Sequence, residues 1–259
     1  MGSFVVLNKG IFFQAINVVA FAVMIVVNGL AGSTRLLGGV TSADVSDMYP
    51  TLVTPAGFTF SIWGVIYTLL LLFTVYQLLP KNRDKPFLQQ IGLLFALSSV
   101  CNISWLFLWH YELVTYSLAL MFALLATLIW TYLRLGIGKT VVSLKEMALV
   151  HLPFSVYLGW ISIATIANVS VALTAVGWDG WGIPDATWAV VIICVALVLT
   201  LAMLATRKDL AFSLVVVWAL VGILSKQSDF QDIVLAAEVC IAIILLAAVA
   251  VVLVSKFKR

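Results

Sequence analysis

The stretch Ile11–Ala31 reads IFFQAINVVAFAVMIVVNGLA and contains no charged residue. About 20 apolar residues are enough for one helix to span the hydrocarbon core of a bilayer. The stretch is longer than the apolar region of a secretory signal peptide, which covers about 7–15 residues. We therefore predict a retained transmembrane helix here.

Apolar runs of this kind recur along the whole chain. Of 259 residues, 64% are hydrophobic and 10% are charged, whereas a soluble domain carries roughly 25% charged residues. Membranes are spanned by helices or by closed barrels, and barrel strands are segments of about ten residues with alternating polarity. The long uncharged runs therefore predict an all-α polytopic membrane protein. We expect about eight transmembrane helices, at residues 11–31, 56–79, 87–109, 113–134, 146–176, 187–206, 210–225 and 232–255.

The distribution of Lys and Arg supports this count. With eight spans, all of the 14 basic residues except Arg35 and Lys226 lie on the side of the N-terminus. Basic residues gather on the cytoplasmic side of membrane proteins, so we expect a multi-pass protein with both termini cytoplasmic. The net charge of +3 is small and its basic residues lie in connections between spans. We therefore expect the lipid bilayer as a partner, and no nucleic acid.

Two connections on the opposite side are unusual. The first, Gly32–Pro55, is long, and long loops in compact proteins are often functional. The other contains Trp178 and Trp181 and is followed by Trp188. These tryptophans are explained either by an aromatic belt at the membrane interface or by a lid over a site.

No motif of a soluble enzyme occurs in the sequence, which lacks a P-loop, GxGxxG after a strand, HExxH and GxSxG. His110 and His151 fall near opposite faces of the membrane, so we do not expect them to share a metal. We expect no catalytic residues, no metal and no required cofactor, and we interpret the chain as a non-enzyme.

Three predicted helices carry aromatic and amide residues on one face, at helical spacing. The residues are Phe60, Trp63, Tyr67, Asn102, Trp105, Tyr157, Trp160 and Asn168. Helix packing is enough to explain any one of these stripes. Their shared depth, together with Asn28 of the first helix, favours a binding site, because polar groups at this depth cost free energy unless they are partnered. An aromatic cavity with a few amides suits a flat, mostly apolar ligand.

Glu238 in the last span is a further candidate. It lies in the outer half, where an ionised carboxyl is costly. Two interpretations stay open: a proton- or ion-coupled step, and a carboxyl that reaches surface water. Glu146 and Asp209 lie at span ends, and we expect both to be solvated.

Three motifs resemble the TspO/MBR family, the tryptophan-rich sensory proteins. Thr54–Tyr67, TPAGFTFSIWGVIY, resembles the signature of that family's second helix, with Trp63 and Tyr67 four residues apart. Asn102-Ile103-Ser104-Trp105 resembles the Asn-x-x-Trp of the third helix. Leu152–Tyr157 with Trp160 and Asn168 resembles the motif of the fifth helix, with Tyr157 where Trp is usual.

The resemblance implies a five-helix membrane bundle over residues 1–176, with a ligand pocket near the first loop, and three additional transmembrane helices over 177–259. The family is associated with porphyrin-type tetrapyrroles, sterols and sensing. Our first interpretation is therefore a membrane-embedded binding or sensory protein for a flat hydrophobic ligand. A small-molecule or ion-coupled transporter that uses Glu238 is the second interpretation. The third is an accessory subunit of a larger membrane complex. The expected protein partner is either a second copy, in a homodimer, or a membrane complex.

Overall fold

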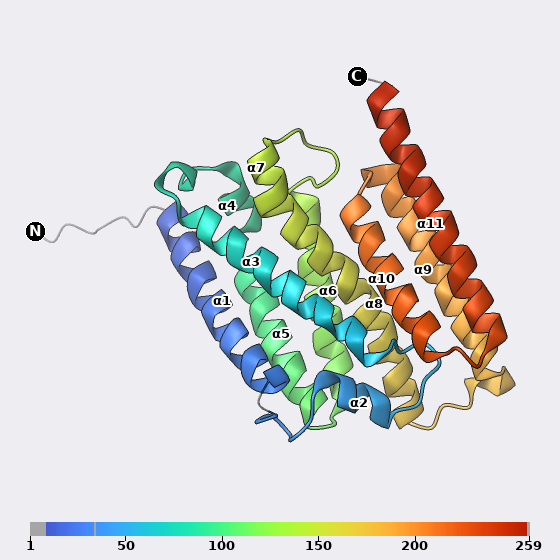
Figure 1. Ribbon diagram of the computed structural model, residues 1–259. Coiled ribbons are helices and arrows are strands. Elements are labelled where there is room, and N and C mark those ends of the chain that lie inside the picture. The colour runs from blue at the N-terminus through green and yellow to red at the C-terminus, as the bar shows by residue number, and fades with distance from the viewer. Residues whose placement is uncertain (1–8, 34, 258–259) are drawn as a thin grey trace, which may run out of the picture.

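A computed structural model describes residues 9–33 and 35–257, which form a bundle of long helices (Figure 1). The long helices are α1 (Lys9–Ser33), α3 (Ile62–Leu78), α5 (Leu94–His110), α6 (Val114–Arg134), α8 (Leu152–Ala175), α9 (Asp185–Arg207), α10 (Leu210–Lys226) and α11 (Gln231–Phe257). Shorter helical elements join them: α2 (Ser42–Met48), η1 (Gly57–Ser61), η2 (Pro80–Asn82), α4 (Pro86–Ile91), α7 (Leu144–Glu146), η3 (Met147–His151) and η4 (Gly180–Gly182). No strand occurs within the described part of the chain.

The lengths of the helices match a membrane. Among the residues that the structure describes, six helical segments are long and apolar enough to cross it, and α5 and α10 are apolar helices of 17 residues. At 1.5 Å per residue they cover about 26 Å, close to the roughly 30 Å hydrocarbon core. Each expected span corresponds to one of the eight helices, which confirms the expected all-α membrane fold. Lys258 and Arg259, which contributed to the charge distribution, lie outside the described residues.

The expected span 87–109 is divided into two helices. Gly92 follows α4 with φ 53° and ψ −124°, a conformation that glycine adopts readily and other residues do not. The chain turns there, and α4 packs separately against α1 and α6. Periodicity did not reveal this break because residues 86–110 contain no Asp, Glu, Lys or Arg and read as one uncharged run.

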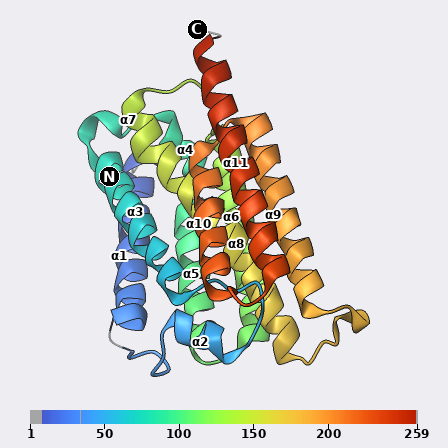
Figure 2. The same ribbon diagram turned by 45° about the vertical axis from the view of Figure 1, so that its right-hand side comes forward.

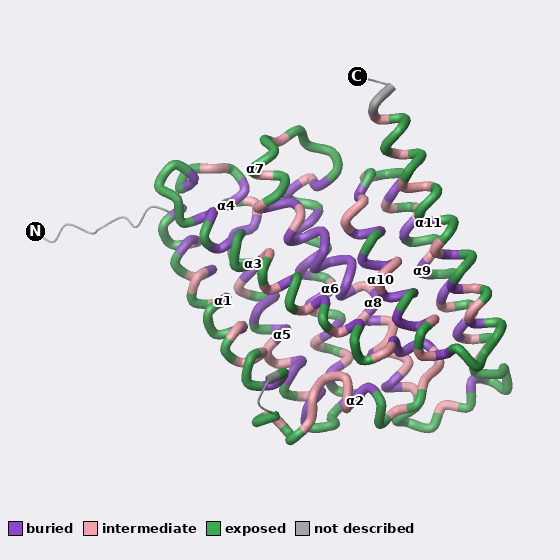
Figure 3. The backbone as a smooth tube through the Cα atoms, viewed as in Figure 1, coloured by how far each residue is buried: buried purple, intermediate pink, exposed green. Residues whose placement is uncertain are grey.

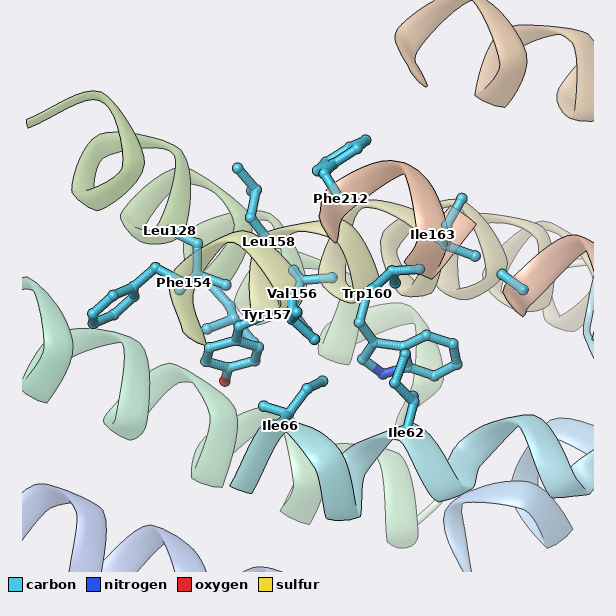
Figure 4. Close-up of a cluster of buried hydrophobic side chains, with 14 of the residues drawn as sticks. Ile62, Ile66, Leu128, Phe154, Val156, Tyr157, Leu158, Trp160, Ile163 and Phe212 are labelled. Atoms are coloured by element: carbon cyan, nitrogen blue, oxygen red, sulfur yellow. The ribbon is translucent and has the colours of Figure 1, made fainter. Parts of the chain in front are cut away.

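Five helices form a closed ring. α3 packs against α1, α1 against α5, α5 against α6, α6 against α8, and α8 back against α3. α8 is the most enclosed of them, with buried residues on all sides (Figure 3), as expected for a helix that is apolar all round. Tyr157 and Trp160 of α8 project toward α3, where Ile66 and Ile62 meet them (Figure 4).

α10 joins the remaining helices to this ring. It packs against α8, while α9 and α11 pack against each other and against α10 (Figure 2). Gly159 of α8 permits the close approach, because a Cβ there would lie 3.1 Å from Val215 and 3.3 Å from Phe212 of α10. Small residues at such crossings let membrane helices pack closely. The division of the chain into two domains at residue 176 stays a prediction.

Candidate functional site

One end of the ring is covered by the first long connection, and we call residues 35–56 the lid. α2 lies within the lid, at the opposite end of the molecule from α4 and α7 (Figures 1 and 2). Thr41 caps α2: its Oγ1 accepts from Asp44 N at 3.2 Å, and Asp44 Oδ2 accepts from Thr41 N at 2.8 Å. The hydrogen bond from the Thr41 backbone lowers the pKa of Asp44, and Arg35, 3.2 Å away, acts in the same direction. The lid is therefore an ordered structure with its own cap.

The lid is held on two sides. On the ring side, Trp109 Nε1 donates to Ser42 O at 3.1 Å. On the α10 side, Lys226 pairs with Asp47, and Gln227 Nε2 donates to Thr51 O at 3.3 Å. The lid thus bridges the five-helix ring and α10.

The end of the lid is locked more tightly to α10. Ala56 N donates to Gly222 O at 3.0 Å, and Trp218 Nε1 donates to Thr59 O at 3.0 Å. A Cβ on Gly222 would lie 2.0 Å from Thr59 Oγ1. Only a glycine permits this contact between α10 and η1.

An aromatic cluster lies beneath the lid. The indole of Trp63 is at its centre, with ring centroids 5.5–6.3 Å away on Tyr67, Trp105, Tyr157 and Trp160. Phe60 completes the cluster, 6.0 Å from Trp160 and edge-on to it. Rings at these separations and tilts attract one another. The structure therefore brings together all six aromatic residues singled out in the sequence.

Asn28 connects the polar groups of this cluster. Its Nδ2 donates to Asn102 Oδ1 at 2.8 Å, and its Oδ1 accepts a hydrogen bond from Tyr67 OH. The sequence analysis noted the depth of Asn28 but did not include it among the candidate site residues. The missed signal was a lone amide near the end of an otherwise apolar helix.

Asn168 is placed differently from Asn102. Its Oδ1 accepts from Trp105 Nε1 at 2.9 Å, and its Nδ2 donates to Ser117 Oγ at 3.1 Å. These bonds tie α8 to α5 and α6. The amide is already used by the protein, so Asn168 holds Trp105 in place.

Three polar groups in the cluster have no hydrogen-bond partner among the described residues: Asn102 Nδ2, Tyr157 OH and Trp160 Nε1. All three are buried in the structure. Buried polar groups are almost always paired, because an unmade hydrogen bond in a low-dielectric interior costs free energy. Of these three residues, Trp160 is the one that borders a cavity described below.

Two cavities flank the cluster. The lid cavity, of about 340 Å³, is bordered by Asn28, Tyr67 and lid residues 41–43. A smaller one, of about 30 Å³, is bordered by Trp105, Trp160 and Asn168. Phe60 and Trp63 line both cavities and form the wall between them. Asn102 and Tyr157 line neither, and lie behind this wall.

The carboxylates do not join this site. Glu238 lies on an exposed face of α11 and lines none of these cavities. The expected solvation of Asp209 is wrong: it is 7% exposed and accepts from Ser155 Oγ at 2.5 Å and from Tyr132 OH at 2.7 Å. Tertiary packing buries it because α10 begins against α6 and α8. The expected solvation of Glu146 is also wrong: its side chain is 14% exposed and lies 3.7 Å from Lys85.

The fold and site together define an all-α integral membrane protein with an aromatic, lidded cavity between its helices. A family model described as TSPO-like protein matches residues 14–251. The chain therefore belongs to the TSPO-like protein family, as the three motifs indicated, and the match extends through α9 and α10 into α11. Comparison with curated proteins and with solved structures gave no match.

Proposed function

We propose that the protein is a membrane-embedded binding protein with a sensory role, and that its ligand is a flat hydrophobic molecule of the tetrapyrrole or sterol class. The observation that carries the proposal is the set of three unpaired polar groups, on Asn102, Tyr157 and Trp160, within a cluster of aromatic rings. Sites for small molecules are mostly apolar, with a few placed polar groups that fix orientation. Membership of the TSPO-like family supports the same ligand class. The proposal involves binding alone, without a chemical step.

The wall between the two cavities determines which ligands fit. A volume of about 340 Å³ is at the small end of the roughly 300–1,000 Å³ typical of ligand sites. A wide ring system therefore requires Phe60 and Trp63 to shift, which joins the lid cavity to the smaller one. This movement would also bring the ligand next to Asn102 and Trp160, and it links ligand binding to the position of the lid.

The test is a spectral titration of the purified protein with a porphyrin and, separately, with a sterol. Trp63→Ala removes the central ring and should weaken porphyrin binding about five- to a hundredfold, the equivalent of about 1–3 kcal/mol for one large buried side chain. Trp130→Ala is the matched control, because Trp130 of α6 is 61% exposed and lies outside the cluster. Both variants must elute in detergent as the parent does. Parent-like binding by Trp63→Ala would exclude the aromatic cluster as the site.

We also propose that the lid faces the outside of the cell and that both termini are cytoplasmic. The support is the sparseness of Lys and Arg on the lid face. Single cysteines at Ser255 and Asp229, in a protein without its three native cysteines, test this with a membrane-impermeant maleimide. Labelling of intact cells at 229 alone fits the proposal, and labelling at 255 alone reverses it. Ser3, the natural probe for the N-terminus, lies outside the described residues.

A further inference from the structure

A third cavity, larger than the two already described, lies outside the aromatic cluster. Its volume is about 440 Å³, and α6, α8, α9 and the lid segment Pro50–Val53 form its walls. Its deep part is apolar, with Val169 and Leu173 of α8 opposite Ala189 and Ile192 of α9. From Asp185 to Ile192 the cavity follows α9 for about 10 Å at 1.5 Å per residue. It therefore runs from the lid face into the apolar layer and has the shape of a site for one elongated apolar group.

The mouth of this cavity is aromatic and acidic. Trp178 and Trp188 line it with ring centroids 5.4 Å apart, and Asp185 is the one ionisable residue in its lining. Trp188 Nε1 donates to Gly180 O at 3.0 Å, which fixes the indole before any ligand arrives. Trp181 packs against both indoles, at 5.4 and 5.9 Å. The tryptophans expected as a belt or a lid are thus gathered at the entrance to a cavity.

The negative charge of the lid face around this cavity favours a ligand with a cationic head group. The lid face carries the acidic residues Asp44, Asp47, Glu112, Asp179, Asp185, Asp229 and Asp232, and its basic residues are Arg35 and Lys226. Both basic residues are paired with lid carboxylates. Within the described ranges Asp185 has no ion-pair partner, and its side chain is exposed. A cation at the mouth meets a free carboxylate and the faces of indole rings, which attract alkylammonium groups.

We propose that the α8–α9 cavity binds an amphiphile with a single apolar chain inside it and an alkylammonium head at Asp185, Trp178 and Trp188. This site is separate from the aromatic cluster and does not depend on the function proposed above. The apolar walls of the cavity fit the chain of such a molecule. The carboxylate and the indoles at its mouth fit the cationic head. A carboxylate or sulfate head would meet Asp185 and an acidic face, and is disfavoured by like charge.

The experiment uses a hexadecyl ammonium amphiphile with a nitroxide at its head, added to the full-length protein in uncharged maltoside micelles. A nitroxide quenches nearby indoles, so occupancy appears as a saturable loss of tryptophan fluorescence above the linear loss caused by micellar partition. Val169→Phe fills the apolar part and should abolish the saturable component. Asp185→Asn should weaken binding about two- to fivefold, in the range of an exposed ion pair. Asp229→Asn, which removes an exposed carboxylate of the same face outside the cavity, should leave it unchanged.

Three results would overturn the proposal: saturable quenching that survives Val169→Phe, an affinity unchanged by Asp185→Asn, or equal competition by the uncharged hexadecyl analogue. Because the probe and the micelles are the same throughout, partition cannot produce a difference between variants. Val169→Phe must elute in detergent as the parent does and unfold at the same temperature, which shows that it is folded. Asp185 is exposed, so its variant tests the head group without disturbing the core.

Discussion

The five-helix ring and α10 place their polar groups in opposite ways. In the ring, amides and hydroxyls converge at one depth beneath the lid, where Asn102, Tyr157 and Trp160 each leave a polar atom unpaired. α10 has its anchors at its ends: Asp209 at the start, and Lys226 with Gln227 at the finish. Unpaired buried groups cost stability and paired ones contribute to it. The ring therefore retains unpaired polar groups in its interior, whereas the paired groups at the ends of α10 fix the neighbouring segments in place.

The largest effect is expected at the start of α10, where Asp209 anchors the helix. Asp209→Ala leaves Ser155 Oγ, Tyr132 OH and Phe212 N without their shared acceptor. We expect the free energy of unfolding to fall by about 3 kcal/mol, as when a buried charged group is removed from its network. Thermal unfolding in detergent measures the loss. Asp84→Ala, an exposed carboxyl on the same end of the molecule, should leave the unfolding temperature unchanged, and equal losses in both would reject the anchor.

Gly222 tests the other half of α10. Gly222→Ala places a Cβ 2.0 Å from Thr59 Oγ1 and 2.9 Å from Pro55 Cβ. Overpacking of this kind typically costs about 1–3 kcal/mol, and here it should also push the lid away from the ring. Ligand dissociation should quicken together with the loss of stability. The double variant Gly222→Ala/Thr59→Ala removes the closer clash and should recover part of both effects, whereas no recovery would place the strain elsewhere.

The ion pair between Lys226 and Asp47 should have a smaller effect. Lys226→Met removes this pair and the 3.4 Å bond to Thr54 Oγ1. Because Asp47 is largely exposed, water screens the pair, and we expect ligand dissociation to speed up only about two- to fivefold. Stopped-flow dissociation measures this, and about 0.5 M salt should produce much of the same change in the parent. Lys139→Met, an exposed lysine far from the lid, should have no effect.

The smallest expected effect concerns pH and the cap of α2. The pKa of Asp44 is lowered by its hydrogen bonds with Thr41, so the folded lid favours the ionised form. This stabilisation is present above the ordinary value of 3.8 and is lost as the pH falls through the lower pKa of the folded state. Amide exchange in α2, corrected for its intrinsic rate, should quicken in that window. Asp44→Asn should remove this step, and an unchanged step would exclude Asp44 as its source.

Local pattern was enough to predict much of the fold. Uncharged runs of about 20 residues identified the spans, because a helix of that length crosses the bilayer and satisfies its own backbone hydrogen bonds in lipid. Helical spacing placed Phe60, Trp63 and Tyr67 on one face, because residues three, four and seven apart share it. The family motifs added the order of the helices, which the match to residues 14–251 supports.

Which groups meet was decided only by the tertiary structure. Asp209 looks solvated in the sequence, yet its partners Ser155 and Tyr132 lie 54 and 77 residues away. Lys226 reaches the lid from 179 residues away. Asn102 and Asn168 are both amides on the polar face of an apolar helix, so the sequence does not distinguish them. In the structure the Asn168 amide is hydrogen-bonded, whereas Asn102 Nδ2 has no partner among the described residues. The sequence by itself determines which helices form and which faces are polar, because hydropathy and periodicity are local. Burial and pairing depend on helices that are distant in the chain, so only the tertiary structure decided them.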